Sequence, residues 1–281
     1  MPKVSVLTPI YNTNPQYLRD MIESVLNQTF TDFEFLILND SPDNLEIEKI
    51  VLEYAGRDKR IKYSKNENNM GITPSRNKLL EMARGEYLAI FDHDDISLPD
   101  RLDKEAQYLD EHSEIGVVSS WVQYFGNKNY IRKNPETDEI IKIYMTDNLC
   151  IMHTAAMIRK SVLDENNIQY ESKYTPAEDY ALFARLMDKT KFHNIQDVLV
   201  KYRVFGTNTS CQQSNKINEK HDMIQQMVCT QYPDLRREFT DKYDCGTKYR
   251  LRLFGFIPLL KIKKHRVYLF EFIPLFKLKW K

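Results

Sequence analysis

The chain has 281 residues, 42% of them hydrophobic, and its 40 basic side chains balance 40 acidic ones. This length is sufficient for a substantial buried core, so we expect an ordinary soluble protein with one large domain, or a domain and an appendage. No apolar run approaches the roughly 20 residues that span a bilayer, which argues against a transmembrane helix.

The amino terminus and the cysteines predict a cytosolic protein. The segment MPKVSVLTPI passes directly into a strand pattern and does not resemble a signal peptide. The four cysteines show no CxxC spacing, which favours reduced thiols. They are Cys150, Cys211, Cys229 and Cys245.

Strands and helices alternate along the first hundred residues. β-branched runs predict the strands, and apolar residues at helical spacing, such as Leu18, Ile22 and Val25, predict the helices. The predicted strands are 3–12, 32–40, 60–66 and 86–92, and the predicted helices are 15–30, 44–58 and 74–85. This alternation predicts a parallel sheet covered by helices on both faces.

The pattern is less regular after residue 96. The predicted elements are a helix at 97–112, a strand at 115–126, loops at 127–148, a strand-like run at 149–163, a helix at 177–190, strands at 192–210 and a helix at 215–231. Near the carboxyl terminus, LFGFIPLLKIK (253–263) and LFEFIPLFKLK (269–279) match at eight of eleven positions. Two copies are too few for a solenoid, which needs at least about three.

Polar residues follow each of the first four predicted strands. In parallel sheets, ligands bind beyond the carboxyl ends of the strands, so four polar ends in succession predict one polar cleft. The polar ends are Thr8 to Asn12, Asn39 to Ser41, the segment NENNMGITPSRN (66–77), and Asp92 to Asp95.

The segment FDHDD ends an apolar strand in three aspartates and one histidine. Two aspartates separated by one residue can hold a divalent cation against a diphosphate, because hard cations prefer carboxylate oxygens. The alternative is that Asp95 or Ser97 caps the following helix while the other acids are solvated. Asp95 can serve either purpose.

Five segments with polar ends follow one another over residues 3–210: VSVLTPIYN, LILNDSPDN, NMGITPSRN, FDHDDISLPDRL and AEDYALFARL. In kind and in order, these segments resemble those of the inverting, GT-A-type glycosyltransferases of family 2. The resemblance implies an α/β fold of the GT-A type: a Rossmann-like, mostly parallel sheet flanked by helices. The implied domain is 1–210, with a nucleotide-binding half (1–98) and an acceptor-binding half (99–210). A helical segment (211–245) and a basic aromatic tail (246–281) form the carboxyl-terminal extension.

The resemblance also implies the site residues. Thr8, Pro9 and Tyr11 would line the nucleotide pocket, and Asp40 would accept a hydrogen bond from a uracil imide, which favours a UDP-sugar donor. Asn69, Gly71 and Arg76 would hold the ribose or diphosphate. Asp92 would lie near the ribose and sugar, and Asp94 would be the principal ligand of Mn²⁺ or Mg²⁺.

Two acids in AEDY are the candidates for the general base that deprotonates the acceptor hydroxyl. By the resemblance, Asp179 would be the base, and Glu178 would orient the acceptor or share the role. The alternative is that both acids only favour the amino terminus of the following helix.

Three further positions stay open. His93 lies on the opposite side of an extended chain from Asp92 and Asp94, so we expect a structural role. His153 is equally compatible with contact to the acceptor and with a place in the core. In YRVFGTNTS, Phe205 stands where the family often carries a histidine, and Arg203, Thr207 or Asn208 would have to compensate as diphosphate contacts.

The tail carries a concentrated positive charge. From Gly246 onward there are ten basic residues and one acid, a net charge of +9, which leaves −9 on the rest of the chain. Interleaved apolar and basic residues favour contact with an anionic membrane surface, and a lipid-linked or glycan acceptor would give that contact a purpose. The alternative is paired strands packed on the body. We therefore expect a cytoplasmic enzyme bound peripherally to the inner face of a bacterial cytoplasmic membrane.

Other classes of protein fit less well. A sugar nucleotidyltransferase is expected to carry a glycine-rich phosphate loop, and LTPIYNTNP contains no glycine. GxGxxG and GxxxxGK[ST] are absent from the sequence, which argues against dinucleotide oxidoreductases and P-loop enzymes. We expect no nucleic-acid partner. A catalytically degenerate sugar-nucleotide-binding or scaffold protein is the alternative to a glycan-extending transferase.

Overall fold

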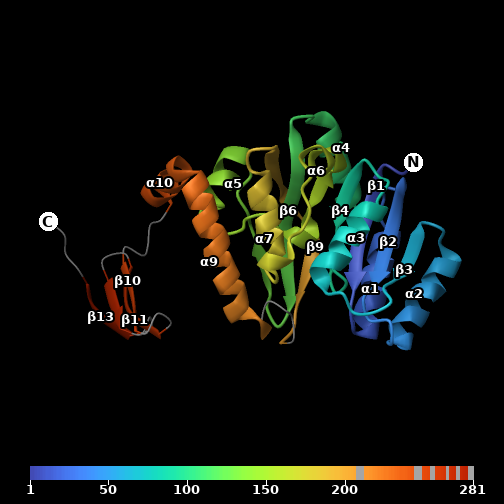
Figure 1. Ribbon diagram of the computed structural model, residues 1–281, viewed down its shortest axis with the longest axis horizontal. Helices are drawn as coiled ribbons and strands as arrows, with labels where there is room; N and C mark the ends of the chain where they lie inside the picture. Colours follow the sequence, from blue (N-terminus) through green and yellow to red (C-terminus); the bar gives the residue numbers. More distant parts are fainter. Residues whose placement is uncertain (207–211, 244–248, 254–256, 264–265, 270–272, 278–281) are drawn as a thin grey trace. The chain divides into compact units, whose positions relative to one another are not determined.

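The structure is a computed structural model, which describes residues 1–206, 212–243, 249–253, 257–263, 266–269 and 273–277. The chain divides into two compact units, Met1–Val228 and Cys229–Lys281. The first unit extends beyond residue 210, because most of helix α9 (Ser214–Gln231) belongs to it. Figure 1 shows the elements in chain order.

The amino-terminal half consists of four parallel strands with a helix in each connection. The strands are β1 (Val4–Ile10), β2 (Phe33–Asn39), β3 (Ile61–Lys65) and β4 (Tyr87–Ile90), and the helices are α1 (Pro15–Leu26), α2 (Leu45–Arg57) and α3 (Ile72–Met82). Their order in the sheet is β3-β2-β1-β4, and every neighbouring pair is parallel. The predicted fold class is confirmed.

Local sequence explains where these helices begin. The Asn14 side chain accepts hydrogen bonds from the backbone N–H groups of Gln16 and Tyr17, and Pro15 occupies the first turn of α1. Asn44 caps α2 in the same way. Gly71 precedes α3 with a φ of 85°, a left-handed conformation that glycine adopts without strain.

The second half adds strands of mixed direction to the same sheet. The elements are β5 (Ile96–Ser97), α4 (Arg101–Glu111), β6 (Ile115–Gly126), β7 (Tyr130–Arg132), α5 (Asp138–Tyr144), η1 (His153–Ala155), β8 (Met157–Arg159), α6 (Lys160–Asn166), η2 (Ser172–Tyr174), α7 (Glu178–Leu186) and β9 (Lys191–Val204). The sheet order is β3-β2-β1-β4-β8-β6-β9-β5, and β7 pairs with β6. Only β6 and β9 are parallel in this half.

Two predicted elements differ from the structure. The run 149–163 forms a strand only at Met157–Arg159, because a 3₁₀ turn precedes that strand and α6 follows it. A short apolar run in the sequence does not distinguish a strand from a buried helix. Ser97 pairs in β5, so α4 begins later than predicted, at Arg101.

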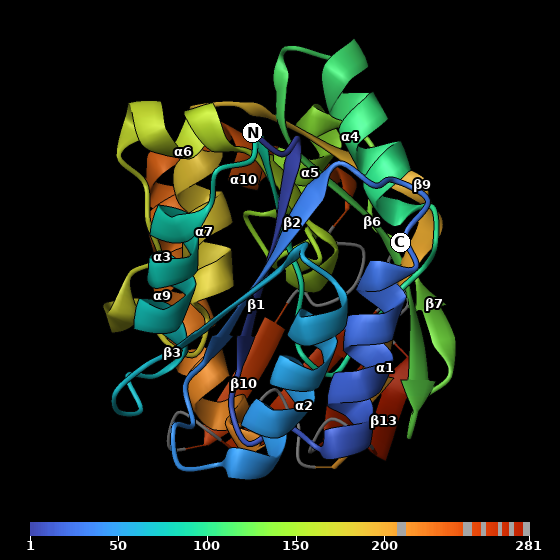
Figure 2. The same ribbon diagram turned by 90° about the vertical axis from the view of Figure 1, so that its right-hand side faces the viewer.

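Helices cover both faces of the sheet. Figure 2 shows α1, α2 and α4 on one side and α3, α6 and α7 on the other. On α4, the side chains of Arg101 and Glu105 form a fully buried ion pair with a nitrogen–oxygen distance of 3.2 Å. Arg101 also donates to the carbonyl oxygen of Ile90 at 2.9 Å, which ties α4 to the end of β4. Burial raises the pKa of Glu105 to about 7, against the influence of Arg101.

The second unit contains α10 (Pro233–Lys242) and a four-stranded antiparallel sheet. The strands are β10 (Tyr249–Leu253), β11 (Ile257–Lys263), β12 (Arg266–Leu269) and β13 (Ile273–Lys277), in that order. The two repeat copies thus contribute β11 and β13 and the last residues of β10 and β12, Leu253 and Leu269. Residues 254–256, 270–272 and 278–279 of the copies lie outside the described part. Among the described residues, no helix has both the length and the hydropathy to cross a membrane.

Candidate active site

The candidate site begins at the carboxyl ends of β1 and β2. Thr8 is fully buried on β1, and its hydroxyl has no hydrogen-bond partner among the described residues. Pro9 follows on the same strand, and Tyr11, just beyond it, is 51% exposed. The backbone N–H of Asn12 donates to the Ser41 hydroxyl, which joins the loops that follow β1 and β2.

Asp40 holds the loop that leads into α3. Its buried carboxylate accepts hydrogen bonds from the backbone N–H groups of Met70 and Gly71, both at 2.8 Å, and from the Asn66 side chain at 2.7 Å. A carboxylate offers about four acceptor positions, so one remains for a ligand. Asn69, in the same loop, is exposed. The structure thus brings Asp40 and Gly71 into direct contact.

Arg76 connects the two halves of the site. One of its Nη atoms lies 2.6 Å from Glu178 Oε1 and the other lies 3.3 Å from Asp92 Oδ1. Arg76 and Glu178 are 102 residues apart in the sequence. The guanidinium therefore joins the predicted donor side, at Asp92, to the predicted acceptor side, at Glu178.

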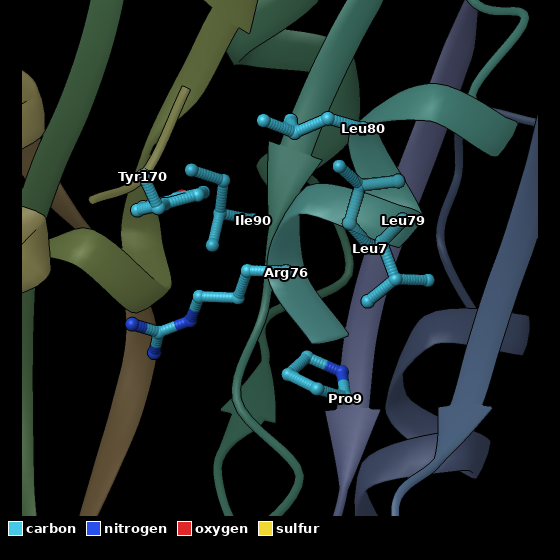
Figure 3. A pocket seen from close by; sticks show the side chains of 7 residues that line it. All are labelled: Leu7, Pro9, Arg76, Leu79, Leu80, Ile90 and Tyr170. Atoms are coloured by element: carbon cyan, nitrogen blue, oxygen red, sulfur yellow. The ribbon is translucent and has the colours of Figure 1, made fainter. Parts of the chain in front are cut away.

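Figure 3 shows the Arg76 stem in a small pocket, with the guanidinium pointing away from the leucine side chains. The pocket is lined by Leu7, Pro9, Arg76, Leu79, Leu80, Ile90 and Tyr170. Because this lining is almost wholly apolar, the pocket supports the Arg76 stem rather than a charged ligand.

Glu178 and Asp179 open helix α7. Glu178 is buried, and its Oε2 atom has no hydrogen-bond partner among the described residues. Asp179 Oδ1 accepts a hydrogen bond from the backbone N–H of Tyr180 at 2.8 Å. Burial raises the pKa of both carboxyl groups, and the Arg76 guanidinium acts in the opposite direction. A raised pKa makes an aspartate a stronger base, as general-base catalysis requires.

The segment Asp92–Asp95 concentrates negative charge at the end of β4. Burial raises the pKa of Asp94, and the Asp92 charge raises it further, while His93 and Arg203 lower it. Burial and the charges of Asp94 and Asp92 raise the pKa of Asp95 well above its ordinary value. Asp95 Oδ2 is buried without a hydrogen-bond partner among the described residues. A cation placed at this segment would reduce the repulsion between the carboxylates and would give the buried Asp95 oxygen a partner.

The donor set suits a cation that is shared with a ligand. Within the described part of the chain, no three His, Cys, Asp or Glu side chains converge as a metal-binding group. The oxygens of Asp92 and Asp94 nevertheless fit Mg²⁺ or Mn²⁺, because such ions commonly retain water and phosphate ligands beside one or two carboxylates.

Arg203 contacts this segment from β9. Its Nε donates to the carbonyl oxygen of Asp94, and its backbone N–H donates to Asp95 Oδ1, both at 2.8 Å. The prediction placed Arg203 near the diphosphate, and the structure places it on the backbone of Asp94. Thr207 and Asn208, the other candidates for this role, lie outside the described residues.

His153 lies in the interior. It is buried, and its Nε2 shares a hydrogen bond of 2.8 Å with the Tyr170 hydroxyl. Burial, with the nearby Arg76 charge, holds the pKa of His153 well below its ordinary value. Of the two alternatives for His153, contact to the acceptor and a place in the core, the buried position corresponds to the second. His93 Nδ1 is buried and has no hydrogen-bond partner among the described residues.

Sequence reasoning missed three residues that order the site. The Thr154 hydroxyl accepts a hydrogen bond from the backbone N–H of Asp92. Asn66 bonds to Asp40, and Asp20 on α1 forms an ion pair with Arg203. Asn66 lies in the polar segment after the third predicted strand, which was a usable signal. Asp20 and Thr154 lie within apolar-periodic segments that carry no such signal.

Comparison with known proteins places the chain in context. The model of glycosyl transferase family 2 matches residues 5–166. An uncharacterized glycosyltransferase of Methanocaldococcus jannaschii is 39% identical over 209 residues, which are 72% of this chain and 71% of that protein. The poly(ribitol-phosphate) beta-N-acetylglucosaminyltransferase TarP of Staphylococcus aureus is 29% identical over 70% of this chain and 61% of its own length.

A solved structure has the same fold. Residues 1–349 of S. aureus TarS, in complex with UDP-GlcNAc, superpose with a TM-score of 0.64 at 20% identity. The match covers 86% of this chain and 76% of the TarS fragment. At this level of identity the likeness concerns the fold alone.

Proposed function

We propose, since this chain belongs to glycosyl transferase family 2, that it transfers a sugar from a UDP-sugar to a hydroxyl of a growing surface glycan, with inversion and with the assistance of Mn²⁺ or Mg²⁺. One observation carries the proposal. Arg76 bridges Asp92 and Glu178, so the carboxylates at the end of β4 and those at the start of α7 form one site.

The donor side would hold the nucleotide and its diphosphate. The remaining acceptor position of Asp40 suits the N–H of a uracil imide, and the loop that Asp40 holds would lie against the ribose. Asp92 and Asp94 would hold the divalent cation. When bound, that cation stabilises the negative charge that develops on the leaving diphosphate. The structure of TarS, which was solved with UDP-GlcNAc, also supports the proposal of a UDP-sugar donor.

On the acceptor side, a carboxylate would take the proton of the attacking hydroxyl group. The acceptor oxygen attacks the anomeric carbon on the face opposite the diphosphate, the bond from that carbon to the diphosphate oxygen breaks, and UDP leaves with the electron pair. Asp179 takes the hydroxyl proton as this bond forms, and its raised pKa suits that step. Glu178, fixed by Arg76, would orient the acceptor.

A relative and the basic tail support the proposed acceptor class. TarP acts, by its name, on poly(ribitol-phosphate), so the acceptor of this relative is a polymer. The ten basic residues after Gly246 would draw the protein to anionic headgroups on the inner face of the cytoplasmic membrane, where a lipid-linked glycan would be extended.

A panel of UDP-sugars, with GDP-mannose as the competing donor class, tests the proposal. UDP or GDP release is measured with Mn²⁺, with Mg²⁺ and with EDTA, in the presence of acceptor glycans. We expect UDP release from one UDP-sugar, dependent on metal and on acceptor. Tight UDP-sugar binding without release under any condition would instead identify a degenerate binding protein.

A further inference from the structure

Arg203 lies in an enclosed position between α1, β6 and the Asp92–Asp95 segment. Its side chain is only 13% exposed. Besides the Asp94 carbonyl, its guanidinium donates through Nη2 to Asp20 Oδ2 at 2.9 Å. Two of its nitrogens are thus committed to fixed partners, one on the segment and one on helix α1.

Aromatic rings surround the same guanidinium. The Tyr17 ring centroid lies 4.0 Å from the Arg203 Cζ atom, and the Phe125 centroid lies 4.7 Å from it. These distances are within the range of favourable cation–π contacts. Phe205, at the position where a histidine was expected, packs on Tyr17 with 5.4 Å between the ring centroids.

We propose that Arg203 is a positioning residue, which sets how tightly the Asp92–Asp95 segment binds a divalent cation by fixing the peptide that follows Asp94. We call Arg203, Asp20, Tyr17 and Phe125 the arginine clamp. The inference rests on the proposed function, because it requires Asp94 to be a metal ligand.

The bonding pattern explains why an arginine is needed. The Nε bond holds the carbonyl of Asp94, and the backbone N–H of Arg203 holds the side chain of Asp95, so both residues joined by the Asp94–Asp95 peptide are fixed by Arg203. The Asp20 ion pair anchors the guanidinium to a helix. A lysine has a single nitrogen on a flexible stem and cannot hold the carbonyl and the carboxylate in this geometry.

Outer partners of metal ligands commonly contribute about 10- to 100-fold to metal affinity. We therefore expect Arg203→Lys to weaken Mn²⁺ binding by about that factor. Asp20→Asn leaves the bond to Asp94 in place and removes only the negative charge that anchors the guanidinium, so the loss of Mn²⁺ affinity is expected to be smaller. Arg19→Gln is the matched control, because Arg19 lies on the same helix and pairs with Glu53 rather than with the segment.

The experiment measures Mn²⁺ affinity in the presence of UDP by electron paramagnetic resonance, and UDP affinity in EDTA by calorimetry. For Arg203→Lys and Asp20→Asn we expect weaker Mn²⁺ binding, unchanged UDP binding in EDTA, and thermal unfolding close to that of the wild type. Arg19→Gln should match the wild type throughout.

The outcomes separate the two proposals. Wild-type protein that binds no Mn²⁺ with UDP would overturn the metal-assisted function itself. Wild-type binding that persists unchanged in Arg203→Lys would overturn only the clamp. An equal loss of UDP binding in EDTA would show a general structural role and would also overturn the clamp. If Arg203→Lys does not fold, the comparison of Asp20→Asn with Arg19→Gln tests the clamp. Mn²⁺ binding that is equal in these two variants would then overturn it.

Discussion

At the amino end of β1 and β2, the buried carboxylate of Glu34 is fully compensated by its neighbours. It accepts hydrogen bonds from the Ser5 hydroxyl at 2.7 Å, and from the backbone and guanidinium of Arg84 at 2.7 to 3.1 Å. Burial acts to raise the pKa of Glu34, but the bonds from Arg84 and Ser5 outweigh it and the pKa lies below its ordinary value.

At the carboxyl end of the same sheet, a group of buried and half-buried carboxyl groups is undercompensated. The pKa is raised for all four of Asp94, Asp95, Glu178 and Asp179, first of all by burial. One oxygen of Asp95 and one of Glu178 have no hydrogen-bond partner within the described residues.

The contrast separates a carboxylate that stabilises the fold from a cluster of carboxyl groups that the proposed function assigns to ligand binding and catalysis. A buried carboxylate that is paired inside the chain gains nothing from an external cation. Carboxyl groups whose pKa is raised by burial and by one another's charge bind a proton or a cation instead. Such clusters are typical of functional sites. Four substitutions test this difference.

The largest effect is expected from Asp179→Asn. The amide cannot accept the acceptor proton, so the transfer rate should fall by about 10²- to 10⁴-fold, the usual contribution of a general base. UDP binding should be retained, because the proposed function places Asp179 on the acceptor side. UDP release and calorimetry measure the two quantities. A variant with full transfer activity would exclude Asp179 as the base.

Asp94→Asn should lower the metal-dependent rate by about 10³-fold, since a metal that neutralises a leaving group contributes several kcal/mol and each 1.4 kcal/mol is about tenfold. The same change removes one of the mutually repelling charges, at a half-buried position. The metal-free variant should therefore unfold at the same temperature as the wild type or higher. A clearly lower unfolding temperature would contradict the undercompensated state of this end.

Glu34→Gln should have the opposite signature. Loss of the charge-assisted bonds at the amino end should reduce the free energy of unfolding by about 1–3 kcal/mol, toward the lower value because Arg84 is largely exposed. Activity per folded molecule should stay unchanged. Denaturant unfolding measures the free energy of unfolding, and UDP release measures the activity. A loss of activity without a loss of stability would contradict the purely structural role of Glu34.

Among the three substitutions in the candidate site, Arg76→Gln should produce the smallest change of rate at neutral pH, together with a displaced pH profile. The Arg76 charge acts to lower the pKa of both Glu178 and Asp179. Its removal should raise those pKa values, and since the base must be deprotonated, the acidic limb of kcat should move to higher pH. Glu81→Gln, at an exposed position of the same helix α3, is the control. An unmoved limb would mean that neither acid governs the profile.

The amino-terminal half was predictable because its signals are local. Each strand of β1–β4 is a short apolar run, and Asn14, Pro15 and Asn44 mark helix starts within a few residues. The second half depends on pairing between distant segments. β8 lies between β4 and β6, although residues 149–163 read as one continuous strand. Local periodicity could not distinguish the strand from the turn and helix that flank it.

Similar reasoning applies to the candidate site. The polar residues that follow each strand were sufficient to gather Asp40, Gly71, Arg76 and Asp92 at one edge of the sheet, because parallel strands end together. Their partners were a matter of side-chain geometry. Nothing in the sequence indicated that Asp40 would hold the backbone of Gly71 or that Arg76 would join Asp92 to Glu178.

The sequence by itself determined the α/β class, the edge of the sheet that carries the site, and the acids available for chemistry, because periodicity and residue type are local properties. Only the tertiary structure decided which acids are compensated. Arg84 and Arg76 are both basic residues on or beside α3, yet one neutralises Glu34 at the amino end and the other leaves an oxygen of Glu178 unmet. Burial and distance set that difference, and both depend on contacts between residues far apart in the chain.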